Sequence, residues 1–282
     1  MKFPNYFADA EANLENSDFV IFGVPYDKTT SFRPGASKAP KEIRTASWNF
    51  ETFNIKTGVD LRDIKFHDHG DLDVTKDSPK SMVEKVHNFV SFLIGKNKFS
   101  IAVGGEHSIT PGIIRSFPDD ICVLLLDAHM DFRNEYENEP YNHACVVKRI
   151  SDLIDIENIA VLGVRSAEKE EFEDAKNNKL FFIDSFCVRD DGIKKAVEEI
   201  KTRFKNKKIY LSLDMDVFDP AYAPAVSTPE PFGLTPFDVI EVVETFSSQL
   251  VGFDIVEVCP SYDHGETAIL AAKIIRHLLG EV

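Results

Sequence analysis

The sequence has few of the features that mark secreted, metal-thiolate or nucleic-acid-binding proteins. Its 282 residues include only four cysteines, which are far apart and form no CxxC pair. Such spacing predicts reduced thiols and excludes a disulfide framework. Lys and Arg number 32 against 47 Asp and Glu, so the formal net charge is −15, and the basic residues are dispersed. This excludes the concentrated basic face that a nucleic-acid partner requires.

Long hydrophobic runs are also missing. No apolar stretch reaches the length of a membrane span, so no membrane association is expected. The first 18 residues show neither the apolar centre of a signal peptide nor the Arg-rich pattern of a transit peptide. We therefore expect a cytoplasmic protein.

Apolar residues are abundant in short runs, and they make up 43% of the sequence, with 23 Phe among them. No repeat, low-complexity tract or long linker divides the chain, so we expect one domain over residues 1–282. Helix-patterned segments alternate with the apolar runs, which predicts a mostly parallel sheet. The expected strands are 19–24, 64–66, 99–103, 121–126, 159–162, 180–183, 209–213 and 251–256, and the expected helices are 78–95, 110–116, 144–153, 167–177, 191–204, 235–247 and 267–279.

The apolar run 121–126 ends abruptly in charged side chains. Asp127, His129 and Asp131 follow it, each two residues from the next. In an extended chain such residues share one face, so they converge just past the carboxyl end of the strand, where α/β sheets bind ligands. Carboxylates crowded in this way call for a cation.

Two further runs end in the same manner. The run 209–213 leads into Asp214 and Asp216, and the run 99–103 leads through two glycines into His107. One such Asp is usually a turn former or a helix cap, but the coincidence of three motifs favours a metal site. By contrast, His67-Asp68-His69 is better explained by packing at a strand end or by exposure to solvent. The candidate ligands are therefore His107, Asp127, His129, Asp131, Asp214 and Asp216.

Two imidazoles and four carboxylates form a donor set of oxygen and nitrogen. Such donors suit Mn²⁺ better than a thiolate-loving ion, and no cysteine lies at a ligand position. Six side chains cannot fill two octahedral shells, so some carboxylates must bridge and a shared water must complete them, with ions roughly 3.5–4 Å apart. The expected cofactor is two Mn²⁺ per subunit.

At this point a resemblance becomes specific. The blocks that carry the candidate ligands, in this order and spacing, resemble the signature blocks of the ureohydrolase (arginase/agmatinase) family. Other pieces similar to the family span almost the whole chain. The matching pieces are GGEHS, DAHMD, SLDMDVFDP, GVPYD, SFRPGASKAPKEIR, DHGD, YNHA, STPEP and EVCPSYD.

The resemblance implies a three-layer α/β/α sandwich on a parallel, mostly eight-stranded sheet, of the arginase/deacetylase type. It also implies how the ligands are shared between the two ions. His107, Asp127, Asp131 and Asp214 would surround the first Mn²⁺, and Asp127, His129, Asp214 and Asp216 the second. Homo-oligomers, trimers or hexamers, are a further implication.

Catalytic roles also follow from the resemblance. Glu257 matches the carboxylate that pairs with the substrate guanidinium, and His143 matches the proton-relaying histidine at the site mouth. Thr228 matches a small polar residue on the substrate loop, and Asp131 is the expected proton courier. The chain departs from the family at Ala144 and Ser227, where the family often has Gly.

The implied reaction releases urea from a cationic guanidino compound, with agmatine favoured as the substrate. Arginases that resemble this chain place an Asn two residues beyond the metal-binding Asp131, and here that position is Arg133. The loop also supplies Glu135, Glu137 and Glu139, which would favour a second positive charge over a carboxylate.

Several alternatives remain open from the sequence. Arginine, guanidinobutyrate, formimidoylglutamate and aminopropylagmatine are other possible substrates. A single-metal deacetylase on the same type of sandwich would need fewer ligands than this chain carries. A non-catalytic subunit is the contrasting class, and the full set of six candidate ligands disfavours it.

Overall fold

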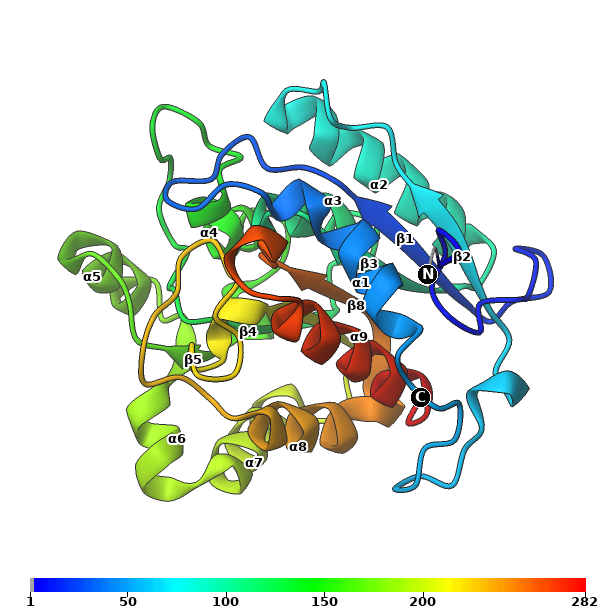
Figure 1. Ribbon diagram of the computed structural model, residues 1–282. Helices are drawn as coiled ribbons and strands as arrows, with labels where there is room; N and C mark the ends of the chain where they lie inside the picture. The colour runs from blue at the N-terminus through cyan, green and yellow to red at the C-terminus, as the bar shows by residue number, and fades with distance from the viewer. Residues whose placement is uncertain (1–2) are drawn as a thin grey trace.

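A single sheet of eight parallel strands forms the centre of the computed structural model, which describes residues 3–282 (Figure 1). The strand order is β2-β1-β3-β8-β7-β4-β5-β6. Most strands are buried along their whole length, as the continuous apolar runs predicted. The strands are β1 (Phe19–Val24), β2 (Phe66–Asp71), β3 (Phe99–Gly104), β4 (Cys122–Leu126), β5 (Ile159–Val164), β6 (Phe181–Asp184), β7 (Ile209–Asp214) and β8 (Leu250–Val256).

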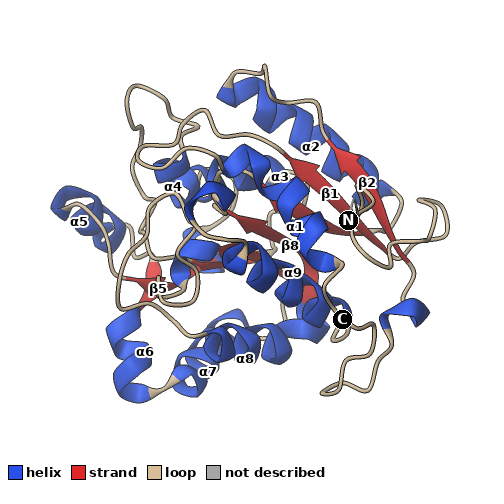
Figure 2. Ribbon diagram, viewed as in Figure 1, coloured by secondary structure: helices blue, strands red, loops and turns tan. Residues whose placement is uncertain are grey.

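Helices cover both faces of this sheet and make three layers, as Figure 2 shows. Each face has its own apolar core, because side chains alternate across a strand. The expected three-layer α/β/α sandwich is confirmed. One face carries α1 (Ala39–Ser47), α6 (Ser185–Asp191), α7 (Ile193–Phe204), α8 (Pro236–Phe246) and α9 (Glu266–Leu279), and the other carries α2 (Pro79–Gly95), α3 (Thr110–Ile114), α4 (Val146–Ser151) and α5 (Lys169–Asn177).

The second strand differs from the sequence expectation. It was expected at 64–66, but β2 begins at Phe66 and continues to Asp71. As an edge strand it is buried only at Phe66 and is partly or fully exposed from there on, so its apolar signal is short. Within it, Asp68 accepts two hydrogen bonds from Arg44, at 2.7 and 3.0 Å, and His67 Nδ1 lies 2.9 Å from the carbonyl oxygen of Ala12. These side chains serve packing, as expected.

Strand order brings the three motif-bearing strands to the middle of the sheet. Strands β3, β8, β7 and β4 are consecutive neighbours, and all run in the same direction. Their carboxyl ends therefore meet at one edge. That edge is where α/β sheets bind ligands.

Two other properties bear on the expectations. Cys122, Cys145, Cys187 and Cys259 are all free thiols, and only Cys187 is exposed. Among residues 3–282, no helix is both long and apolar enough to cross a membrane.

Candidate metal centre

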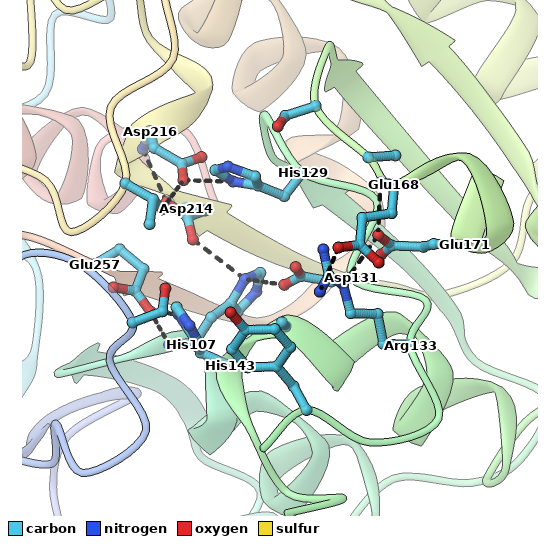
Figure 3. Close-up of a pocket in the computed structure, with 16 residues that line it drawn as sticks. His107, His129, Asp131, Arg133, His143, Glu168, Glu171, Asp214, Asp216 and Glu257 are labelled. Carbon is cyan, nitrogen blue, oxygen red and sulfur yellow. Dashed lines mark hydrogen bonds and ion pairs between the residues drawn. The ribbon is translucent and has the colours of Figure 1, made fainter. Parts of the chain in front are cut away.

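The first group of ligand-type side chains surrounds His107. This residue opens a short helical turn directly after β3, and its ring is buried. Its Nδ1 atom lies 3.1 Å from Asp127 Oδ2, 3.3 Å from Asp214 Oδ2 and 3.6 Å from Asp131 Oδ2. Three separate strand ends thus direct four donors to one point, and Figure 3 labels three of them, His107, Asp131 and Asp214.

A second group shares Asp127 with the first. His129 Nδ1 lies 2.9 Å from Asp216 Oδ2 and 3.6 Å from Asp127 Oδ1. Asp127 therefore presents one oxygen to each histidine. The side chain of Asp214 links His107 to the backbone of the segment that carries Asp216, because its Oδ1 accepts the backbone N–H of Asp216 at 2.8 Å while its Oδ2 faces His107.

The electrostatics of the cluster show that its carboxylates repel one another. Burial, and then the charge of Asp127, raise the pKa of Asp131 well above its usual value. Burial, and then Asp216 and Asp127, do the same to Asp214. Burial lowers the pKa of His107, but Asp127 and Asp214 outweigh this and raise it. Several carboxylates can stay ionised together in so small a space only when positive charge lies between them.

Two buried atoms point directly to a missing partner. His107 Nδ1 and Asp127 Oδ2 are fully enclosed and make no hydrogen bond, although they approach each other to 3.1 Å. Buried polar atoms are almost always satisfied, so unpaired ones require an explanation. Imidazole nitrogen and carboxylate oxygen are donors that suit a divalent cation such as Mn²⁺. The residues present therefore fit a metal site.

A buried network behind the cluster fixes the orientation of His107. The Nε2 atom of this ring lies 3.0 Å from the hydroxyl of Ser212, which donates to Asp254 at 2.6 Å. Tyr210 and Thr110 also donate to Asp254, at 2.9 and 3.0 Å. Outer partners of this kind set the tautomer and angle of a ligating histidine. Sequence reasoning missed them, although an Asp within the apolar run of β8 was a usable signal.

A second support comes from Arg165, just after β5. Its guanidinium donates to the backbone carbonyl oxygens of Asp216 at 2.6 Å, Glu230 at 2.7 Å and Pro231 at 2.9 Å. Because five planar N–H groups can serve several carbonyls at once, one side chain ties the proline-rich loop to the ligand-bearing end of β7.

Glu257 and His143 lie together beside the metal groups. Glu257 Oε1 accepts the backbone N–H of His107 at 2.6 Å and lies 3.7 Å from His143 Nδ1. Burial raises the pKa of Glu257, but His143 and the hydroxyl of Ser227 lower it more, so the carboxylate stays ionised. Burial lowers the pKa of His143, and Glu257 raises it further than that. Each side chain thus favours the charged form of the other.

Two residues at this edge have a strained backbone. Asp131 and Glu257 both have positive φ, at 47° and 65°, a region that side-chain-bearing residues rarely adopt. Strained conformations of this kind persist only where surrounding contacts impose them, and they cluster at functional sites. Thr228 also belongs here, because its hydroxyl lies 3.3 Å from Asp216 Oδ2.

A cavity of about 290 Å³ opens above the cluster. Its far wall includes Arg133, Glu168 and Glu171 (Figure 3), and Tyr136 also lines it. Arg133 Nε lies 3.2 Å from Glu171, and its Nη1 lies 3.6 Å from Glu168. The acidic wall that the sequence predicted therefore exists, but it comes from the start of α5.

The expectation that three glutamates lie at the mouth of the cavity is wrong. Glu135, Glu137 and Glu139 are not among the residues that line the cavity. The chain around them turns outward, with positive φ at Glu137 and at Asn138, so Tyr136 alone of this stretch faces the cavity. Sequence reasoning missed Glu168 and Glu171 because β5 ends without a run of carboxylates.

One other acidic group lies outside this site. Glu244, His277 and Glu281 come together between α8 and the end of α9. The ammonium group of Lys56 already pairs with Glu244. This group is accounted for by ordinary ion pairing.

A parallel sheet with histidines and carboxylates gathered at its carboxyl edge defines an α/β enzyme with a metal-binding site. The family model described as "Arginase family" matches residues 17–280. The chain belongs to the arginase family.

Individual relatives agree with this. An agmatinase of Bacillus subtilis is 34% identical over 97% of this chain and 94% of its own. An N(1)-aminopropylagmatine ureohydrolase of Thermococcus kodakarensis is 35% identical over 94% of this chain and 91% of its own. The crystal structure of agmatine ureohydrolase of Thermoplasma volcanium superposes with a TM-score of 0.95 at 42% identity, covering 100% of this chain and 95% of that one.

Proposed function

We propose that this protein is a two-manganese ureohydrolase that cleaves agmatine to putrescine and urea. The observation that carries the proposal is the pair of side-chain groups joined through Asp127 at the carboxyl edge of the sheet. The names of the agmatinase and agmatine ureohydrolase relatives support the choice of substrate. Agmatine has a guanidinium group at one end and an amine at the other, which suits a cavity with acidic side chains on both walls.

The six candidate ligands divide into two shells that share two residues. Asp127 and Asp214 would belong to both shells. When bound, two Mn²⁺ ions supply Lewis acidity that makes water a competent nucleophile at neutral pH. The first ion would be held by His107, Asp127, Asp131 and Asp214, and the second by Asp127, His129, Asp214 and Asp216.

Glu257 binds and orients the cationic head of the substrate. Its carboxylate is ionised, and it is fixed in place by the backbone N–H of His107 and the hydroxyl of Ser227. A planar guanidinium presents parallel N–H donors that match a carboxylate. This pairing holds the guanidinium carbon toward the carboxylates of Asp131 and Asp214. Thr228 lies on the same wall and supplies a hydroxyl to the substrate.

Proton movement falls to Asp131 and His143. Asp131 Oδ2 takes the proton of the attacking water and passes it to the departing amine, which cannot leave as an anion. His143 Nδ1 exchanges protons between the site and solvent, since the ring sits at the wall of the cavity beside Glu257. Water and agmatine thus yield urea and putrescine with all atoms accounted for.

The remaining parts of the proposal concern the whole protein. We propose a single domain over residues 1–282, located in the cytoplasm and assembled as a homo-oligomer, a trimer or a hexamer. The free thiols support a reducing compartment. Two separate apolar cores on one continuous sheet support a single domain.

A urea-release screen with added Mn²⁺ tests the proposal. The compounds are agmatine, arginine, guanidinobutyrate, formimidoylglutamate and aminopropylagmatine. Aminopropylagmatine is the second candidate, because a relative at 35% identity carries its name. We expect the highest kcat/KM with agmatine. No urea from any guanidino compound, with two ions bound, would overturn the proposal.

A further inference from the structure

Glu106 is a buried carboxylate that the proposed reaction does not use. It lies next to His107 but points away from the ligand groups, toward the segment after β1. Its Oε2 accepts the backbone N–H of Thr29 at 2.8 Å, and its Oε1 accepts the hydroxyl of Thr29 at 2.7 Å. The hydroxyl of Ser108 also donates to Oε1, at 2.6 Å. The carboxylate is thus saturated with donors.

These contacts leave the Thr29 hydroxyl able to act toward other groups only as a hydrogen-bond acceptor. It has a single hydrogen, which is committed to Glu106, so its lone pairs remain available as acceptors. The backbone N–H of His143 donates to that oxygen at 2.9 Å. All three residues are buried, so water does not replace these bonds.

The position of His143 explains why this bond matters. His143 is the first residue of a short 3-10 helix, and the first N–H groups of any helix have no partner within it. The capping side chain of Asn142 accepts the N–H of Ala144 at 3.0 Å and leaves that of His143 free. Thr29, which is 114 residues away in sequence, satisfies it.

We infer that Glu106 and Thr29 are positioning residues that hold His143 in place for proton transfer. Glu106 orients the Thr29 hydroxyl, and the hydroxyl fixes the backbone from which the His143 ring reaches Glu257. The segment after β1 and the loop before α4 are otherwise separate pieces of the cavity wall, which contribute Ser31 and His143 respectively. The inference rests on the proton role proposed for His143.

The test compares Thr29→Val with Thr29→Ser. Valine keeps the shape but removes the hydroxyl, and serine keeps the hydroxyl. We expect Thr29→Val to lower kcat about tenfold, with KM within about twofold and metal content unchanged, because only proton transfer is misaligned. Thr29→Ser should recover most of the turnover. Thr45→Val, at an exposed site on α1, controls for the replacement of threonine by valine and should leave kcat unchanged.

Hydrogen exchange gives a readout that does not depend on activity. The peptide containing residues 141–146 should exchange at least about tenfold faster in Thr29→Val than in Thr29→Ser, since a buried N–H loses its acceptor. Equal exchange in the two variants would overturn the inference. So would loss of metal in Thr29→Val, or equal damage by both substitutions.

A double-mutant cycle separates this inference from the function on which it rests. In a His143→Asn background, Thr29→Val should cost less than about twofold in kcat, because the residue it positions is gone. A full tenfold loss there would contradict the inference. Full activity of His143→Asn alone would instead contradict the proton role of that histidine, whatever the exchange measurement gave.

Discussion

At the scale of single residues, the function depends on side chains that are costly to bury unless a cation or a partner compensates them. Asp214 is the sharpest case, because its carboxylate lies 3.3 Å from His107 and because burial, and then the charges of Asp216 and Asp127, raise its pKa. Each of these groups is destabilising alone and useful only with its neighbours. The same principle holds for Glu257, whose charge is balanced by His143.

Asp214→Asn should empty the metal centre. An amide has one neutral oxygen in place of a charged carboxylate, so a bridging ligand is lost. We expect metal content to fall below about one ion per chain and urea release to fall at least about a hundredfold. Elemental analysis of the purified variant checks this, with Asp120→Asn at an exposed position as the control. Two tightly held ions and near wild-type turnover in Asp214→Asn would refute the ligand assignment.

Turnover should rise with pH through the titration of His143. Burial lowers the pKa of this histidine, but Glu257 outweighs that and raises it, so the ring holds its proton to higher pH than a free imidazole does and loses it as pH climbs through the raised pKa. The neutral ring is the form that can accept a proton, so kcat should increase from about pH 7 to about pH 9.

Substitution of His143 tests whether the titration of this residue causes the rise of turnover with pH. His143→Asn should lower turnover and flatten the profile while both ions stay bound, and His264→Asn, at an exposed position, should leave it unchanged. A profile that falls between these pH values in a folded protein would count against the proton role.

At the scale of elements, close packing among the neighbouring strands β1, β3 and β8 fixes the positions of their carboxyl ends. Gly105 is central to it, because its N–H donates to Val24 and its carbonyl accepts from Glu257, both at 2.8 Å. A side chain at this glycine would overlap the backbone carbonyl of Tyr26. The glycine is needed for close approach of three chain segments, and no bulkier residue fits.

Gly105→Ala should therefore destabilise the protein and reduce its metal content. We expect a loss of roughly 2–4 kcal/mol in the free energy of unfolding, since the backbone at Tyr26, just after β1, must move. Gly95→Ala, in the last turn of α2 with open space around it, should be neutral or stabilising by up to ~1 kcal/mol. Denaturant unfolding of the two variants, with elemental analysis, compares them. Equal stabilities would contradict the packing account.

Elements with a strong apolar signal could be predicted from sequence, and those shaped by polar contacts could not. All eight strands were expected, because most are continuous buried runs. Helix α1 was missed, since its buried face includes Arg44, which is paired with Asp68 and would be exposed in an ordinary amphipathic helix. Helix α6 is only seven residues long and carries little periodicity.

Some residues of the site could likewise be predicted from the sequence, and others could not. The strand-end motifs predicted which side chains meet, because parallel strands end at one edge. The far wall of the cavity was predicted from the wrong residues, since a loop direction depends on tertiary contacts that sequence spacing does not encode. Glu168 and Glu171 became visible only once α5 was placed.

At the scale of the whole molecule, the choice of substrate depends on the balance of charge at the mouth of the cavity. Arg133 is the cation nearest to where a substrate tail would lie, and Glu171 and Glu168 compensate it. Among the described residues that line the cavity, no Lys or Arg other than Arg133 is present to face the carboxylate of arginine, whereas the amine of agmatine would meet Glu168 and Glu171. We expect kcat/KM for agmatine to exceed that for arginine by at least about two decades, which corresponds to about 3 kcal/mol. Equal values would remove agmatine as the preferred substrate without affecting the urea-releasing chemistry.

The proposed function requires two ions, held at the carboxyl edge of the sheet, for release of urea from agmatine. The most direct measurement is a titration of the metal-free protein with Mn²⁺ in which urea release and bound metal are followed together. The account predicts that activity with agmatine saturates when two ions are bound per chain. Full activity with one ion or none would contradict it.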